Sequence, residues 1–108
     1  MRIQKRYQKA VDEFLKRVLE KYRDKIDSII LFGSVARGVA KEESDIDILI
    51  VTRYEDFKLR RALVGIAFDI LLETEKNISV KTLSKDEFER RKNFSFLKNV
   101  VSEGVKVA

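Results

Sequence analysis

Apolar residues recur along this chain with two spacings, one typical of helices and one typical of buried strands. From about Gln4 to Arg23 they fall at steps of three and four residues, with Lys and Arg on the other side, which predicts a helix packed by one stripe. Ile29–Phe32 and Asp45–Val51 are apolar almost without interruption, as in central strands covered on both faces. We interpret Asp24–Ser28 as a short polar connection.

The pattern continues with a second long helix and a third strand. The segment from about Asp56 to Glu73 returns to helical spacing. Its buried stripe is predicted to comprise Phe57, Leu63, Ile66, Ile70 and Leu71. Ile78–Leu83 alternates as a strand that places Ser79 and Lys81 on the same face.

Local signals near the carboxyl end predict two further helices and a last strand. Ser84 and Glu87 match a capping box at a helix start. A separate helix is expected over Ser95–Glu103, and Gly104 suits the left-handed position after its last turn. The residues of this helix expected to face inward are Phe96, Leu97, Val100 and Val101. Val105–Val107 is a candidate short strand.

This order of elements predicts the fold class α+β, a two-layer α/β domain in which a small mixed sheet is flanked by helices. No repeat, linker or low-complexity segment interrupts the chain, so residues 1–108 are expected to form a single domain. The long connection between the first two strands leaves their relative direction open.

Composition and charge narrow the functional classes. There is no Cys and no His among the 108 residues, which excludes disulfides, thiolate or zinc-type sites and imidazole catalysis. No run approaches the roughly 18 apolar residues of a membrane span, and the amino-terminal segment is too charged for a secretory signal. We therefore expect a cytoplasmic protein without a membrane partner.

The net charge of +5 arises from 23 Lys and Arg against 18 Asp and Glu. A basic balance can accompany a nucleic-acid or polyphosphate partner. Here acidic residues are intermixed with the basic ones, which favours a solvated, salt-bridged surface. Nucleic-acid binding ranks last among the functions considered, because no aromatic or base-reading pattern accompanies the charge.

The strongest functional signal lies where the first two strands meet their connection. Gly33 and Ser34 follow the first strand, and Asp45 and Asp47 open the second. Strand side chains repeat every two residues, so the two carboxylates share a face and repel each other unless a cation lies between them. Oxygen ligands favour a hard cation such as Mg²⁺. We predict a nucleotide–metal site; the structural alternative makes Asp45 a cap and Asp47 an incidental strand residue.

The segment GSVARGVAKEESDID, from Gly33 to Asp47, resembles the signature of the DNA polymerase beta-like nucleotidyltransferase superfamily. The short chain is similar to its minimal nucleotidyltransferase family over nearly the whole length. The resemblance implies a mixed sheet flanked by helices and transfer of an NMP, AMP from ATP above all, to an acceptor hydroxyl. It also implies a helical HEPN-domain partner, with this chain as the antitoxin of a toxin–antitoxin pair.

The resemblance further implies roles for the matching residues. Gly33 and Ser34 would hold the triphosphate, with Ser34 also a candidate helix cap. Asp45 and Asp47 would be the catalytic pair and would ligate two Mg²⁺ ions. Arg37 is a candidate phosphate partner, or an ordinary surface arginine.

The sequence departs from the family pattern at a third position. Active members usually carry another carboxylate on a later strand, and here Ser79 takes that place, with Lys81 on its face. A serine hydroxyl is no base near neutral pH and only a weak metal ligand. Asp69 is a candidate substitute acid, although simple solvent exposure is the favoured explanation. The alternative function is therefore a catalytically weak or inactive module that binds nucleotide or a regulatory partner.

Overall fold

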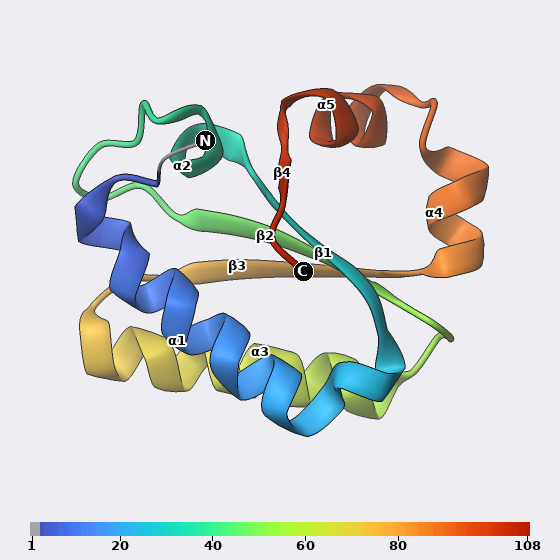
Figure 1. Ribbon diagram of the computed structural model, residues 1–108, viewed down its shortest axis with the longest axis horizontal. Coiled ribbons are helices and arrows are strands. Elements are labelled where there is room, and N and C mark those ends of the chain that lie inside the picture. Colours follow the sequence, from blue (N-terminus) through green and yellow to red (C-terminus); the bar gives the residue numbers. More distant parts are fainter. Residues whose placement is uncertain (1–2) are drawn as a thin grey trace.

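The computed structural model describes residues 3–108 and arranges them as helices packed on a small sheet (Figure 1). Met1 and Arg2, which belong to the domain predicted over residues 1–108, lie outside the described residues. Among the described residues, no helix has the length and apolar character needed to span a membrane. The elements are, in chain order, α1 (Lys5–Tyr22), the 3₁₀ turn η1 (Arg23–Lys25), β1 (Ile26–Phe32), α2 (Gly33–Arg37), β2 (Ile46–Thr52), α3 (Phe57–Thr74), β3 (Ile78–Ser84), α4 (Lys85–Arg91), α5 (Ser95–Glu103) and β4 (Val105–Lys106).

The sheet is mixed, as predicted, with the strand order β3-β2-β1-β4. Strand β1 runs antiparallel to β2 and β4, whereas β2 and β3 are parallel. The direction that the sequence left open is therefore antiparallel. The prediction of a polar connection over Asp24–Ser28 was wrong in its second half, because Ile26 already pairs with Thr52 of β2 and extends β1 backwards.

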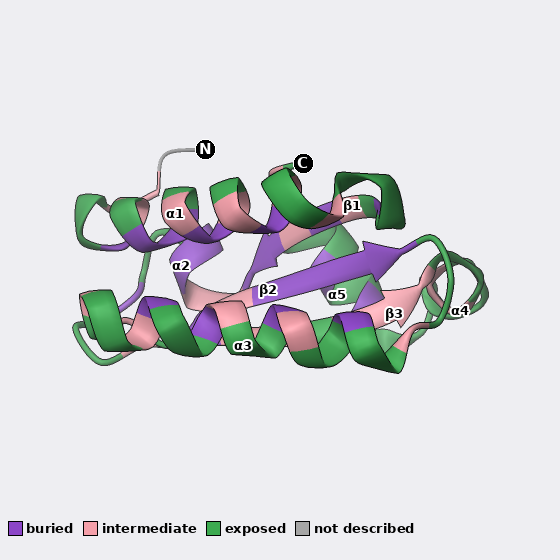
Figure 2. Cartoon of the chain, turned by 90° about the horizontal axis from the view of Figure 1, so that it is seen from below, coloured by how far each residue is buried: buried purple, intermediate pink, exposed green. Residues whose placement is uncertain are grey.

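Alternation along β2 divides the core between the two faces of the sheet. Ile46, Ile48 and Ile50 belong to the larger cluster, which they share with residues of α1 and α3. Leu49 and Val51 point the other way and pack with residues of α5. Helices α1 and α3 lie side by side over the first face (Figures 1 and 2). The second face is covered less completely, and it is this face that carries the candidate site.

Helix α3 confirms the predicted element but not its whole buried stripe. Its first turn is capped by Asp56, whose carboxylate accepts a hydrogen bond from the Leu59 N–H at 3.0 Å. Leu63 and Ile70 are fully buried, as predicted. Phe57 is exposed instead, because it lies on the side of the helix opposite Leu59, whose side chain takes the place in the core.

The carboxyl-terminal helix has the predicted bounds, but two inward assignments were wrong. Leu97 and Val100 are buried, whereas Phe96 and Val101 are half exposed. The Phe96 ring packs edge-on against Phe32, with ring centroids 5.7 Å apart. One face of this helix meets the sheet, so residues at its margins stay in solvent.

Gly104, which follows α5, is not left-handed as predicted; its φ is −78°. Its small size serves close packing instead. A Cβ added at Gly104 would lie 2.7 Å from Cγ2 of Ile30 and 3.1 Å from the carbonyl oxygen of Leu31. Gly104 thus lets the chain leave α5 directly against β1 and form β4.

The capping box predicted at the start of α4 is half formed. The Ser84 hydroxyl accepts a hydrogen bond from the Glu87 N–H at 3.2 Å. The Glu87 carboxylate pairs with Arg90 and Arg91 one turn further along the helix. The serine alone therefore caps this helix.

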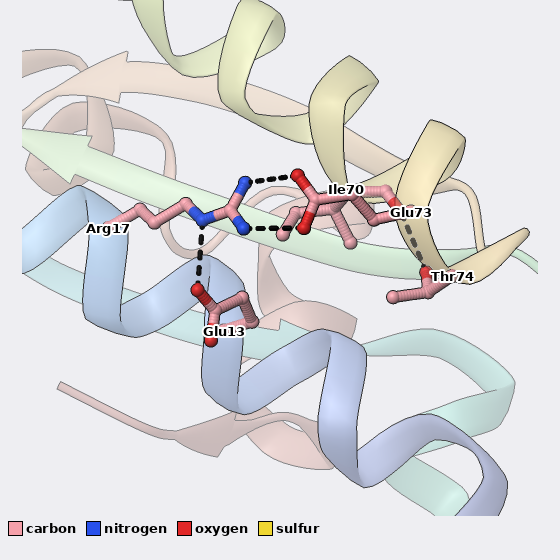
Figure 3. Close-up of polar contacts among 5 residues, drawn as sticks. All are labelled: Glu13, Arg17, Ile70, Glu73 and Thr74. Atoms are coloured by element: carbon pink, nitrogen blue, oxygen red, sulfur yellow. Dashed lines mark hydrogen bonds and ion pairs between the residues drawn. The ribbon is translucent and has the colours of Figure 1, made fainter.

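Arg17 on α1 ties the two covering helices together (Figure 3). Its two terminal nitrogens donate to the carboxylate of Glu73 on α3, at 2.8 and 2.6 Å, and its Nε donates to Glu13 at 3.0 Å. The hydrogen bonds from Arg17 hold the pKa of Glu73 below its usual value. The bidentate geometry fixes the orientation of the guanidinium, so this contact helps to set how α1 lies against α3.

Replacing Glu73 should make the stability of the protein less sensitive to acid. Because the pKa of Glu73 is lowered in the folded state, its stabilisation is present above the ordinary pKa near 4.5 and is lost as pH falls through the folded-state value. Glu73→Gln should therefore have a lower Tm than the wild type at neutral pH, and the difference should vanish in strong acid. Thermal unfolding followed by circular dichroism measures this.

The matched control is Glu20→Gln, an exposed position of α1 outside the ion pairs found among the described residues. It should change Tm little at any pH. A Tm difference for Glu73→Gln that persisted unchanged into strong acid would contradict the ionic origin of the contact.

Candidate active site

The predicted site residues meet at one end of the second face of the sheet. Because β1 and β2 are antiparallel, Phe32 at the end of β1 pairs with Asp47 near the start of β2. The chain then turns at Gly33 into α2. Because β2 and β3 are parallel, Ser79 pairs with Asp47 from the other side. Asp47 therefore lies on the strand between the glycine turn and the position where a third carboxylate was expected.

Gly33 packs directly on the carboxylate of Asp47. Its φ is +75°, a left-handed conformation that other residues rarely adopt. A Cβ added there would lie 3.1 Å from Cγ of Asp47 and 3.3 Å from its Cβ, and closer still to Oδ2. Both the conformation and the lack of space disfavour a side chain at this position.

Helix α2 holds the turn in place. Val35 and Ala36 are buried in the larger core cluster, and Gly38, with φ of +73°, ends the helix by donating its N–H to carbonyl oxygens of the preceding turn. The prediction that Ser34 caps this helix was wrong: Phe32 is at the N-cap position and no side chain caps it. Helix α2 starts at Gly33, so Ser34 lies in its first turn, where it is partly exposed.

The two carboxylates have different surroundings. Asp45 is exposed, whereas Asp47 is partly buried. Burial raises the pKa of Asp47, and the charge of Asp45 raises it further, while Lys81 and Arg37 act in the opposite direction. The positive charges of Lys81 and Arg37 therefore favour the ionised form of Asp47, which its burial and the charge of Asp45 disfavour.

The donor set suits Mg²⁺ in company with a nucleotide. Among the described residues, no three His, Cys, Asp or Glu side chains gather as a metal cluster. Mg²⁺ is commonly held by one or two carboxylates together with substrate phosphates and waters, and Asp45 and Asp47 offer such a pair. Asp69 does not join them: it is exposed on α3, which covers the opposite face of the sheet. The prediction of Asp69 as a substitute acid was wrong for this reason.

Two hollows are lined by neighbours of Asp47, one by Gly33 and the other by Leu49 and Lys81. A smaller hollow of about 220 Å³ is lined by Phe32, Gly33, Arg37, Phe96, Asn99, Val100 and Glu103. Arg37 spans it and approaches Glu103, with Nη1 3.4 Å from Oε2. Sequence reasoning did not identify Asn99 or Glu103 as site residues, because their approach to Gly33 and Arg37 joins segments far apart in the chain.

A larger groove of about 730 Å³ begins beyond Lys81, on the β3 side of the site. Lys81 and Leu49 follow Ser79 and Asp47 on the same face of their strands. The other side chains along the groove include Arg60, Arg91, Phe94 and Phe96. The alternating pattern of β3 already predicted that Lys81 shares a face with Ser79. The other residues that line the groove are brought together only by tertiary packing.

The two left-handed glycines allow a matched test of the close approach to Asp47. Gly33→Ala should lower the free energy of unfolding by about 2–4 kcal/mol, since it combines a left-handed alanine with a steric clash. Gly38→Ala is the control, because a Cβ there meets no atom within 4 Å; it should cost about 1–2 kcal/mol from backbone conformation alone. Urea unfolding compares the two, and equal losses would contradict the steric role of Asp47.

Comparison with curated proteins identifies relatives over most of the chain. It is 42% identical to "Putative protein adenylyltransferase MJ0604" of Methanocaldococcus jannaschii, a match that covers 90% of this chain and 93% of that protein. It is 36% identical to "Putative protein adenylyltransferase MJ1305" of the same organism, covering 68% of this chain and 59% of that one.

Solved structures share the fold. A nucleotidyltransferase structure from Sulfolobus solfataricus has a TM-score of 0.60 at 24% identity, covering 94% of this chain and 78% of that one. A toxin–antitoxin structure with AMP-PNP also has a TM-score of 0.60, at 22% identity, covering 88% and 70%. The sequence matches the family described as "Nucleotidyltransferase domain" over residues 11–107. This match, together with the fold and the curated relatives, shows that the chain belongs to the nucleotidyltransferase family.

Proposed function

We propose that this nucleotidyltransferase transfers AMP from ATP to a hydroxyl group of a protein, in a reaction that depends on Mg²⁺. The observation that carries the proposal is the packing of the Gly33 backbone on the Asp47 carboxylate, with Asp45, Arg37 and Lys81 around it. The curated relatives carry the name "Putative protein adenylyltransferase", which supports AMP as the group transferred and a protein as the acceptor.

Each residue of the site has a task in this reaction. Held by Asp45 and Asp47, Mg²⁺ would supply Lewis-acid stabilisation of charge on the phosphates. Gly33 presents bare backbone that phosphate oxygens can approach, and the Ser34 hydroxyl can donate a hydrogen bond. Arg37 can pair with phosphate oxygens. In the transfer, the acceptor oxygen bonds to the α-phosphorus while the bond to pyrophosphate breaks.

The geometry favours one side of the site for the acceptor. Attacking and leaving oxygens lie roughly in line through the phosphorus in phosphoryl transfer. A triphosphate held at Gly33 and Arg37 leaves the β3 side, where Lys81 opens the larger groove, for the acceptor segment. The acceptor proton passes to solvent water, because Ser79 holds a neutral hydroxyl where a carboxylate would take it.

We further propose that the acceptor belongs to a helical HEPN-type partner, with this chain as the antitoxin of the pair in the cytoplasm. The resemblance of the sequence to minimal nucleotidyltransferases motivates this partner. The fold shared with a toxin–antitoxin structure is compatible with it, and the protein acceptors in the names of the curated relatives point the same way.

Loss of either carboxylate should abolish transfer. Asp45→Asn and Asp47→Asn should each reduce AMP incorporation at least about 100-fold, because the negative charge that holds the cation is gone. The assay uses ATP labelled in the α-phosphate, Mg²⁺ and a candidate HEPN-type partner protein. Asp69→Asn, on the opposite face, should transfer at the wild-type rate. Undiminished transfer by both site variants would remove the proposal.

A second function, nucleotide binding without efficient transfer, is favoured by one observation. Ser79 pairs with Asp47 across the strands, so the place for a third carboxylate holds a neutral hydroxyl. In this alternative, calorimetry would show Mg-ATP binding while no partner protein becomes labelled over long incubation.

Restoring the acid distinguishes the two functions. Ser79→Asp should raise kcat about 10- to 100-fold if the missing base limits catalysis, since general-base assistance contributes at least that much. Ser79→Asn is the control of equal size and should leave kcat near the wild-type value. A Ser79→Asp variant that binds Mg-ATP but still shows no transfer would favour the binding module.

A further inference from the structure

The side of α3 that faces away from the sheet carries a row of large apolar side chains. Phe57, Val64, Phe68 and Leu72, here called the α3 stripe, are 66%, 48%, 56% and 67% exposed. Their spacing of seven and four residues places them on one side of the helix, and Figure 2 shows exposed residues along the whole outer side of α3. Single exposed apolar residues are ordinary, whereas a continuous row is typical of an interaction surface.

The first half of the stripe is hollowed in a way that suits a facing helix. A hollow of about 420 Å³ is lined by Phe57, Arg60, Arg61 and Val64. These are positions i, i+3, i+4 and i+7, the four residues that form a hole for a knob in coiled-coil packing. The second half of the stripe offers knobs, Phe68 and Leu72. Helix α3 therefore carries both a hole and the knobs that could fill a hole of this kind.

The charges on α3 select the direction of pairing. The first half of the helix is basic and contains Lys58, Arg60 and Arg61. The second half is acidic and contains Asp69 and Glu73. Antiparallel helices bring opposite halves together, whereas parallel helices would align like charges. Glu73 is already bound to Arg17. Arg61 and Asp69 have no ion-pair partner among the described residues.

Gly65 lies at the middle of this arrangement. If Phe68 enters a hole centred on Arg60 and Arg61, the two-fold axis falls near Val64 and Gly65. Gly65 is exposed, and a Cβ there would meet no atom within 4 Å. A glycine at the crossing point lets two helix backbones approach closely, which offsets its unfavourable helix propensity of about 1 kcal/mol.

We propose that α3 pairs antiparallel with α3 of a second copy of this chain, so that Phe68 of each copy enters the hole of the other. Asp69 then lies beside Arg61 across the interface. Each copy supplies the same surface, so the contact closes as a two-fold dimer. Helix α3 covers the face of the sheet opposite Asp47, so the carboxylate pair of each copy remains open. The proposal does not depend on the function proposed above.

Analytical ultracentrifugation over a range of concentrations tests the dimer. The wild type should show a monomer–dimer equilibrium, and Phe68→Glu should weaken dimerisation at least about 30-fold, as loss of a central interface anchor does. Val101→Glu, at a similarly exposed apolar position on α5, is the control and should dimerise like the wild type. A wild type that stays monomeric at every concentration, or a dimer indifferent to Phe68→Glu, overturns the proposal.

A charge exchange tests the antiparallel direction. Arg61→Asp and Asp69→Arg should each weaken their own dimers about 10-fold or more, because like charges then face each other. Mixed together, the two variants restore opposite charges on both sides of the axis, and native mass spectrometry should detect the mixed dimer in preference to either homodimer. A mixture that forms no mixed dimer contradicts antiparallel pairing, whether or not the single variants dimerise.

Discussion

The candidate site depends on one close contact, the packing of the Gly33 backbone on the carboxylate of Asp47. Antiparallel pairing of β1 and β2 brings the end of one strand to the start of the other, where a Cβ at Gly33 would clash with the Asp47 carboxylate. The contact places the Gly33 backbone next to a carboxylate pair. The fold around it serves to hold these two strand ends in register.

That contact has an energetic cost which the rest of the domain offsets. Partial burial and the neighbouring Asp45 both oppose ionisation of Asp47, and only Lys81 and Arg37 act against them. The strand that carries the pair is anchored by three isoleucines buried in the larger core cluster. Most of the stabilising apolar packing therefore lies between the sheet and helices α1 and α3. The open face instead carries the carboxylates of Asp45 and Asp47, whose repulsion a bound cation would relieve.

The division between the two faces also separates two kinds of surface. The open face presents carboxylates, cations and hollows, which suit a charged nucleotide and a polar acceptor. The outer side of α3, beyond the covered face, presents a row of apolar side chains with charges at its ends. A partner bound at one surface leaves the other accessible, so catalysis and assembly can be served by one small domain.

Local sequence was sufficient for the elements and for the carboxylate pair, because hydrophobic periodicity and the two-residue repeat of a strand act over short range. The resemblance to the family pointed to Ser79 as the third position, and the parallel pairing of β2 with β3 places it beside Asp47. Local sequence failed where position in the tertiary fold decides. Phe57 and Phe96 look like core residues, but Phe57 lies on the outer side of α3 and Phe96 lies at the margin of α5. Gly104 is small because α5 passes close to β1, and Asp69 lies on the helix that covers the opposite face of the sheet. The sequence by itself determined which groups the site contains; the antiparallel pairing of β1 with β2 and the packing of α5, both long-range contacts, decided that Gly33, Lys81 and Glu103 surround them.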